Sequence, residues 1–242
     1  MPLPTIATPT HELELPSTGK KIKYRPFLVK EEKILILALE SQNVKDITLA
    51  IKSVLKDCIL TRGVKVEDLP SFDIEYLFLN IRGKSVGEAI DLIITCSDDG
   101  VTEVPVKIYV DEIQVQKDPE HSPEIKLDDK IAIKMKYPSL DQFIKNNFDF
   151  SATESLSTIE QSFDIIASCI DAVFTAEESW AAADCTKKEL IQFIESMNTE
   201  QFKKIEKFFE TMPKLSHTFE VTNPKTKVKS SVTLEGLTSF FG

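Results

Sequence analysis

Cysteine and histidine are scarce in this chain of 242 residues, and neither is arranged as a metal site or a catalytic group requires. The four cysteines form no CxxC pair, whereas structural zinc needs closely spaced ligand pairs and a disulfide scaffold needs a small, cysteine-dense chain. The pattern predicts buried free thiols in a reducing cytoplasm. The three histidines lie far apart, in segments expected to be extended or loops, so we interpret them as solvated or capping residues.

Long apolar runs and a positive charge balance are also absent. No segment approaches the roughly 20 apolar residues of a membrane-spanning helix, and the first ten residues lack the pattern of a secretory signal. The net charge of −10 argues against a nucleic-acid-binding protein, which needs a basic face. Residues 20–25 form a basic cluster, but lysines that protect a strand edge are a better interpretation than a site for single-stranded nucleic acid. We expect an acidic protein of the cytoplasm.

A charged hairpin followed by an apolar helix is the feature around which the rest of the chain is organised. Residues 12–15 and 21–24 are expected to be its strands, joined by the turn-forming cluster Pro16–Gly19. Residues 21–24 alternate charged and apolar, as half-buried strands do, and Pro26 ends the second strand. A helix from Lys30 carries the run ILILAL, which is apolar on every side and predicts packing on more than one face.

The middle of the chain predicts two more helices and then strands. One helix is expected from the N-cap Asn43 to near Gly63, and another from Ser71 that breaks at residues 82–88. Residues 88–137 contain several β-type runs, two of them joined by Ser-Asp-Asp-Gly, which is a strong hairpin signal. We expect these runs to form a small antiparallel sheet inserted between helical parts.

The C-terminal part is helical again, with a long helix from about residue 155 to 173, two more beginning at Asp184 and Thr199, and a terminal hairpin within residues 217–233. The predicted fold class is therefore α+β: a helical body, a small antiparallel sheet inserted mid-chain and an N-terminal β-hairpin. The expected organisation is a flexible arm, a hairpin and helical part, an antiparallel β part, and a C-terminal helical part with its hairpin: residues 1–11, 12–87, 88–137 and 138–242.

Aromatic residues near the end of the chain have two interpretations. Leu237, Phe240 and Phe241 either close the helical core or form an adhesive surface for another chain, and the first is the better supported. The single tryptophan, Trp180, is expected to be a core or an interface anchor.

Two features of the sequence are similar to parts of enzymatic sites. Gly83-Lys84-Ser85 is similar to the end of a phosphate-binding loop, but the first glycine of that motif is missing and a strand is expected to follow. Asp98-Asp99 and Asp128-Asp129 are paired carboxylates that fit turns, without an EF-hand pattern. We therefore expect no cofactor and no metal, and the alternative is a metal- or nucleotide-dependent enzyme built on these residues.

The stretch LPSTGKKIKYRPFLVKEEKILILALES, followed by a helix, then LPSFDIEYLFLNIRGKSVGE and a cysteine-containing hairpin, resembles the baseplate hub subunit family of T-even-type tailed bacteriophages. The resemblance covers about residues 12–115, and beyond them only the helix-rich character agrees. Some members carry cysteine pairs after this stretch; here only Cys96 remains, beside Asp98 and Asp99, so no zinc site is carried over.

The resemblance implies a non-enzymatic protein of the contractile tail, either a subunit of the central baseplate hub or an assembly chaperone for it. It would act in the host bacterial cytoplasm during assembly, and in the virion tail if it is retained there. The implied partners are other hub and tail proteins, with the tape-measure protein as one candidate.

The residues expected to contact a partner lie in the hairpin and at the start of the helix that follows it. They are Lys21, Lys23, Tyr24, Arg25, Pro26, Phe27, Lys30 and Glu31. The competing interpretation is that Tyr24 and Phe27 pack the hairpin on its own domain, while Arg25 pairs with Glu31 or Glu32.

Overall fold

The computed structural model describes residues 6–140, 142, 158–236 and 239, and it confirms the α+β class. The α-helices are α1 (Val29–Ser41), α2 (Val44–Cys58), α3 (Ser71–Val86), α5 (Thr158–Cys169), α6 (Lys187–Glu195) and α7 (Thr199–Thr211), with short 3-10 helices η1 (Val66–Asp68), η2 (Val110–Glu112) and η3 (Ala182–Asp184). The strands are β1 (His11–Glu14), β2 (Lys21–Tyr24), β3 (Ala89–Thr95), β4 (Glu103–Tyr109), β5 (Gln114–Gln116), β6 (Glu124–Lys126), β7 (Ala132–Met135), β8 (Ile170–Phe174), β9 (Ser179–Ala181), β10 (Lys214–Thr222) and β11 (Lys229–Glu235).

The strands of residues 88–137 belong to three sheets rather than to the single sheet expected there. β3 and β4 pair with each other, β5 adds to β10 in the order β11-β10-β5, and β6 and β7 continue into β8 and β9. β1 and β2 form the expected N-terminal hairpin. The Asp-Gly turn sets the β3–β4 pairing locally, but the partners of β5 and β7 come from residues about 40 to 100 positions later, which a local pattern cannot reveal.

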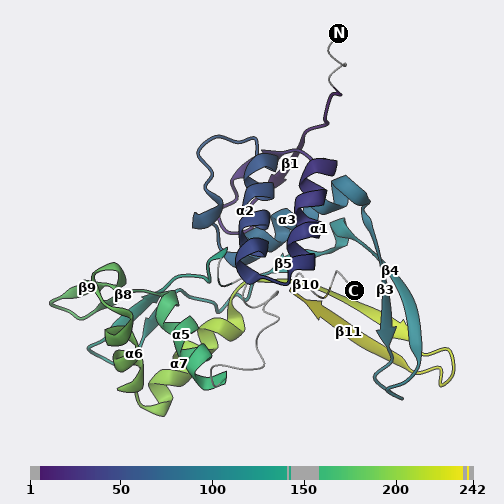
Figure 1. Ribbon diagram of the computed structural model, residues 1–242. Coiled ribbons are helices and arrows are strands. Elements are labelled where there is room, and N and C mark those ends of the chain that lie inside the picture. The colour runs from purple at the N-terminus through teal and green to yellow at the C-terminus, as the bar shows by residue number, and fades with distance from the viewer. Residues whose placement is uncertain (1–5, 141, 143–157, 237–238, 240–242) are drawn as a thin grey trace, which may run out of the picture.

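Helix α3 lies at the centre of the first hydrophobic core. Its buried residues face several directions, and it contacts β5, β10 and η2. α1, α2 and the β1–β2 hairpin cover it, as Figure 1 shows. The turn of the hairpin is tied to α3, since the buried carboxylate of Asp73 accepts hydrogen bonds from the Ser17 amide, at 3.0 Å, and from its hydroxyl.

A second hydrophobic core is built from residues 125–208. The sheet β6-β7-β8-β9 supplies one side of it and helices α5, α6 and α7 supply the other. In Figure 1 this group of elements lies beside the first, and the chain returns from α7 into β10, which rejoins the first core through Leu215. In the sequence, the segment that builds the second core therefore lies between β5 and β10, which pair with each other.

Three predicted helix boundaries were wrong, and the first is that of α2, which ends at Cys58 rather than near Gly63. Helix α3 does not break at residue 82: it runs to Val86 and ends at Gly87, whose φ of +129° few other residues adopt. The helix expected to continue to residue 173 ends at Cys169, and β8 follows, because a short apolar run fits either structure and here β7 and β9 supply ladder partners on both sides.

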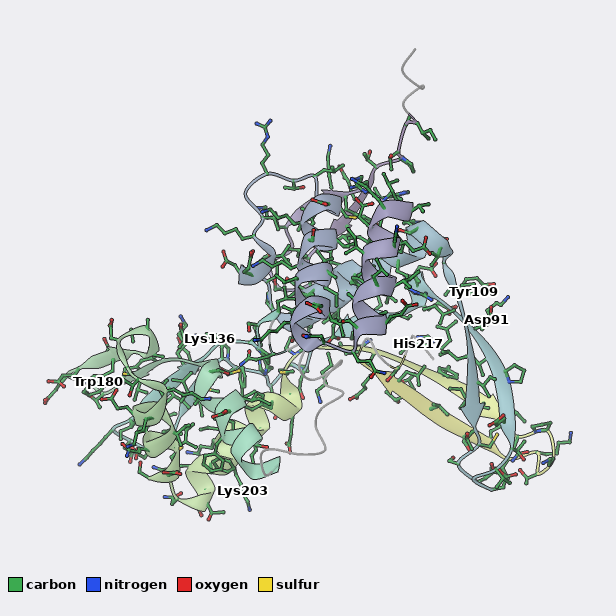
Figure 2. All side chains as sticks on the ribbon, in the orientation of Figure 1. Asp91, Tyr109, Lys136, Trp180, Lys203 and His217 are labelled. Atoms are coloured by element: carbon green, nitrogen blue, oxygen red, sulfur yellow. The ribbon has the colours of Figure 1, made fainter. Side chains whose placement is uncertain are left out.

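The hairpins β3–β4 and β10–β11 form a projecting arm, in which they run side by side away from the helices (Figure 1). Figure 2 shows Asp91 and Tyr109 on the β3–β4 hairpin. The tips of the two hairpins are joined by Asn223, which is 1% exposed and whose amide nitrogen donates to both carboxylate oxygens of Asp98 and to one of Asp99, at 3.0–3.1 Å. The hydroxyl of Thr226 also donates to Asp98. Hydrogen bonds from Thr226 and Asn223 lower the pKa of Asp98.

We expect Asn223→Ala to loosen the end of this arm without unfolding either core. The substitution removes three hydrogen bonds to carboxylates, at a local cost on the order of 2 kcal/mol. Hydrogen exchange of the backbone amides of residues 96–102 should then become faster. Thr218→Val, on an exposed site of the same hairpin, is the control and should leave that exchange unchanged; equal exchange in both variants would contradict the role given to Asn223.

Candidate functional site

The predicted partner-binding residues of the hairpin divide into exposed and buried positions. Lys21, Lys23 and Lys30 are exposed, and Lys23 lies 3.3 Å from a carboxylate oxygen of Glu12 across the hairpin. The side chain of Tyr24 is buried, which raises its pKa to about 12. The remaining members of the set are half-buried or buried: Arg25, Pro26, Phe27 and Glu31. The exposed lysines are the part of this set that a partner can reach directly.

An ion pair joins the hairpin to α1. Arg25 Nη2 donates to Glu31 Oε1 at 2.9 Å, and the other carboxylate oxygen accepts from the amide of Leu28 at 2.7 Å. Lys30 Nζ lies 3.2 Å from Glu31 Oε1. Burial alone would raise the pKa of Glu31, but these hydrogen bonds outweigh it and lower the pKa to about 2. The carboxylate therefore caps the first turn of α1 and fixes the helix against the end of β2.

The Gly83-Lys84-Ser85 segment is part of α3 and has structural contacts. The hydroxyl of Ser85 donates to the carbonyl of Ile81 at 2.6 Å and accepts from the amide of Phe27 at 2.9 Å, while Lys84 pairs with Glu88. At Gly83 a Cβ atom would lie 3.0 Å from the side chain of Val110, so the glycine allows close packing. A phosphate-binding loop would need free backbone amides, which this helical segment does not offer.

The aspartate pairs also act within turns. Asp99 accepts from the amide and the hydroxyl of Thr102, and Asp128 accepts from the amides of Lys130 and Ile131. In the part of the chain that the structure describes, no group of three or more histidine, cysteine or acidic side chains could hold a metal ion. Among those same residues, no helix is long and apolar enough to cross a bilayer.

Helix α1 is far more exposed than its apolar sequence predicted. Only Glu31 and Ala38 of its residues are buried, so the expectation of packing on more than one face was wrong. α3 occupies the central position instead, and α1 packs one face on the body while its other faces reach solvent. The exposed large apolar residues of α1 and its N-cap are Leu28, Val29, Ile34, Ile36, Leu37 and Leu39. Several exposed large apolar residues on one helix are typical of a protein interaction site.

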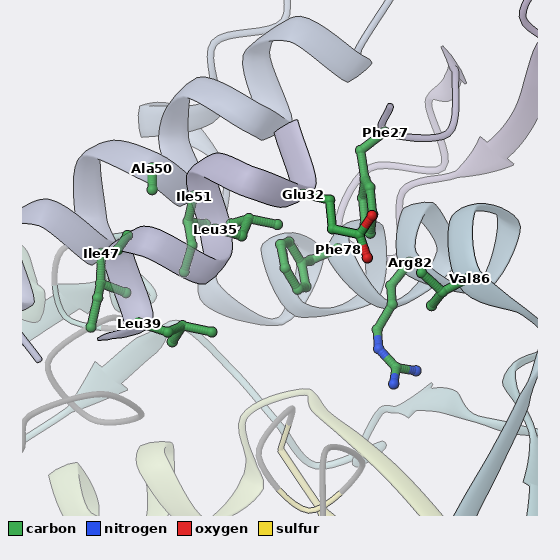
Figure 3. Close-up of a pocket in the computed structure, with 11 residues that line it drawn as sticks. Phe27, Glu32, Leu35, Leu39, Ile47, Ala50, Ile51, Phe78, Arg82 and Val86 are labelled. Carbon is green, nitrogen blue, oxygen red and sulfur yellow. The ribbon is translucent and has the colours of Figure 1, made fainter. Parts of the chain in front are cut away.

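One side of α1 forms the wall of an apolar groove of about 570 Å³. α2 and α3 form the remaining walls, and Figure 3 shows the lining side chains gathered from the three helices. Glu32 and Arg82 are its charged residues, and in Figure 3 the guanidinium group of Arg82 points away from Glu32. The lining residues are Phe27, Glu32, Leu35, Ala38, Leu39, Ile47, Ala50, Ile51, Phe78, Arg82 and Val86. We define this surface as the α1 groove.

The α1 groove is lined mainly by apolar side chains. Among the described residues, its lining has no histidine, cysteine, serine or threonine, and its two charged residues are of opposite sign. Such a site can take up an apolar segment and orient it through a few polar contacts. The sequence predicted Phe27 as a partner-binding residue but did not indicate the other residues that line the α1 groove. The apolar run of the helix from Lys30 was a signal that could have indicated them.

A comparison with protein-family models matches residues 8–242 to one family, described as the T4 bacteriophage base plate protein. The chain belongs to this baseplate family. Membership implies a structural or assembly role in the phage tail, carried out by binding other tail proteins. The comparison with curated proteins and that with solved structures give no match.

Two further expectations concern aromatic residues of this baseplate protein. Trp180 lies in β9 and is 44% exposed, on the second group of elements, where Figure 2 labels it. Leu237, Phe240 and Phe241 lie outside the described residues.

We expect Glu31→Gln to destabilise the protein by about 3 kcal/mol at neutral pH, because it leaves the Arg25 guanidinium beside a neutral group in a buried position. The folded-state pKa of Glu31 lies below its unfolded value of 4.5, so its contribution to stability is present above pH 4.5 and is lost as the pH falls towards 2. Denaturant unfolding at a series of pH values should therefore show a weaker acid dependence in the variant. Glu32→Gln is the control and should change stability by less than about 0.5 kcal/mol.

Proposed function

We propose that this baseplate protein is a subunit of the central hub of the contractile tail, or an assembly chaperone for that hub, and that it acts only through protein–protein contacts. The family assignment supports a tail role, and the resemblance of residues 12–115 to hub subunits supports the finer one. The observation that carries the proposal is the α1 groove, an apolar surface on an acidic chain, next to a hairpin with exposed lysines.

The α1 groove accepts an apolar segment of another hub or tail protein. The exposed part of α1 is contiguous with the groove, so a bound segment would be covered from α1 through α2 to α3. Burying such area contributes about 25 cal/mol for each Å² of apolar surface removed from water, against the cost of ordering the segment.

The exposed lysines of the hairpin act as the charged rim of this surface. Lys21 and Lys23 lie on β2, which leads through Arg25 into α1. Rim charges of this kind mainly raise the association rate and select partners of opposite charge. A partner with an acidic region next to its apolar segment fits both features.

The enzymatic alternative loses its physical basis in this arrangement. Gly83, Lys84 and Ser85 lie in a helix, where Gly83 packs closely on Val110 and the side chains of Lys84 and Ser85 make their own contacts. The aspartate pairs serve their own turns and the arm. The non-enzymatic proposal therefore rests on the contacts these residues make.

We expect Leu39→Glu to weaken complex formation with hub and tail proteins at least tenfold, because it places a charge in the apolar wall of the groove. Co-expression followed by pull-down, and titration with each purified hub protein, measure this. Val228→Glu is a matched control, since Val228 is 45% exposed and Leu39 is 44% exposed, but Val228 lies on the arm. Unchanged binding by a folded Leu39→Glu variant would remove the groove from the proposal.

Reversing the charges of the hairpin should affect association more than the fold. The double variant Lys21→Glu, Lys23→Glu should bind a hub partner about tenfold more weakly, mostly through a slower association rate, and the binding should depend less on salt. The double variant Lys225→Glu, Lys227→Glu carries the same charge change on the arm and should bind as the wild type does. Surface plasmon resonance at two ionic strengths separates these outcomes.

A further inference from the structure

A second surface of α1 lies on the side away from the body and from the groove. Positions separated by three, four and seven residues share a face of a helix, so Val29, Lys33, Ile36 and Glu40 form one line along α1, with Leu37 beside it. Val29 is 79% exposed, Ile36 is 50% exposed and Leu37 is 54% exposed. We define these five residues as the α1 stripe.

The α1 stripe has the pattern of a helix that packs on another helix. Its spacing of four, three and four residues matches that of the seam between paired helices, with apolar residues at Val29 and Ile36 and charged ones at the other two positions. The two charged members, Lys33 and Glu40, are exposed, and neither has an ion pair among the residues that the structure describes. The groove uses different residues of the helix, Glu32, Leu35 and Leu39, so the two surfaces can be occupied at the same time.

The charges of the α1 stripe make it complementary to itself in one orientation. If a second α1 lies antiparallel with the twofold axis between Ile36 and Leu37, Lys33 of one copy lies opposite Glu40 of the other, and the reverse pair forms by symmetry. The same symmetry brings Ile36 of each copy to Leu37 of the other. A parallel arrangement would instead place Lys33 against Lys33 and Glu40 against Glu40, which is repulsive.

We propose that the α1 stripe is an interface between two copies of this chain, packed antiparallel through α1. A pair of 13-residue helices buries less surface than the roughly 1,200–2,000 Å² of a stable interface, so the dimer is weak and depends on concentration. This proposal goes beyond partner binding in the groove and does not depend on it.

Sedimentation velocity of the full chain over a concentration series tests the proposal. The wild type should shift from monomer to dimer as the concentration rises. Lys33→Glu and Glu40→Lys should each weaken the dimer roughly tenfold, because by symmetry each places two like-charge pairs at the interface. The double variant Lys33→Glu, Glu40→Lys exchanges the charges and should restore the wild-type dimer.

The control is Lys203→Glu, on α7, which Figure 2 labels on the second group of elements and which should dimerise as the wild type does. Circular dichroism checks that every variant is folded, which is expected because both substituted positions of the stripe are exposed. A wild type that stays monomeric at all concentrations overturns the proposal. So does a double variant that dimerises no better than the single variants.

Discussion

Burial of α3 is the constraint on which the first group of elements depends. A helix with apolar side chains facing several directions must be covered on all of them, and α1, α2, the β1–β2 hairpin and the strands β5 and β10 supply that cover. Polar contacts then fix the positions of the hairpin and of α1 relative to α3. Asp73 holds the turn of the hairpin through Ser17, and Ser85 holds the entry to α1 through the amide of Phe27.

These contacts fix the position of α1, and in that position several of its large apolar residues are exposed. The buried Glu31 is satisfied by Arg25 and by the amide of Leu28, so the start of the helix is fixed against the hairpin. Farther along, Ala38 is the buried apolar residue, and the larger residues point into the groove or outwards. Exposure of these apolar residues to water is unfavourable for the protein alone. The same residues suit a baseplate protein that binds other tail proteins.

Much of the local structure was predictable because it depends on short-range chemistry. The hairpin turn at Pro16–Gly19, the side-chain cap at Asn43 and the β3–β4 hairpin with its Asp-Gly turn form where their residue types indicated. Two of the boundary errors, at the end of α3 and the end of α5, have a common cause. In the last turn of α3, and at the junction between α5 and β8, the residues fit two local structures, and packing against Val110 or pairing with β7 selected one.

The sequence by itself determined that this is an α+β protein, that its thiols, histidines and carboxylates are not spaced as a local catalytic or metal-binding motif, and which stretch resembles a baseplate family. These follow from composition, spacing and turn chemistry, which act over a few residues. Only the tertiary structure decided which apolar helix is central and which is exposed. The sequence predicted packing on more than one face for α1 and gave no such indication for α3. The difference lies in how many distant elements pack on each helix, a property that no window of neighbouring residues contains.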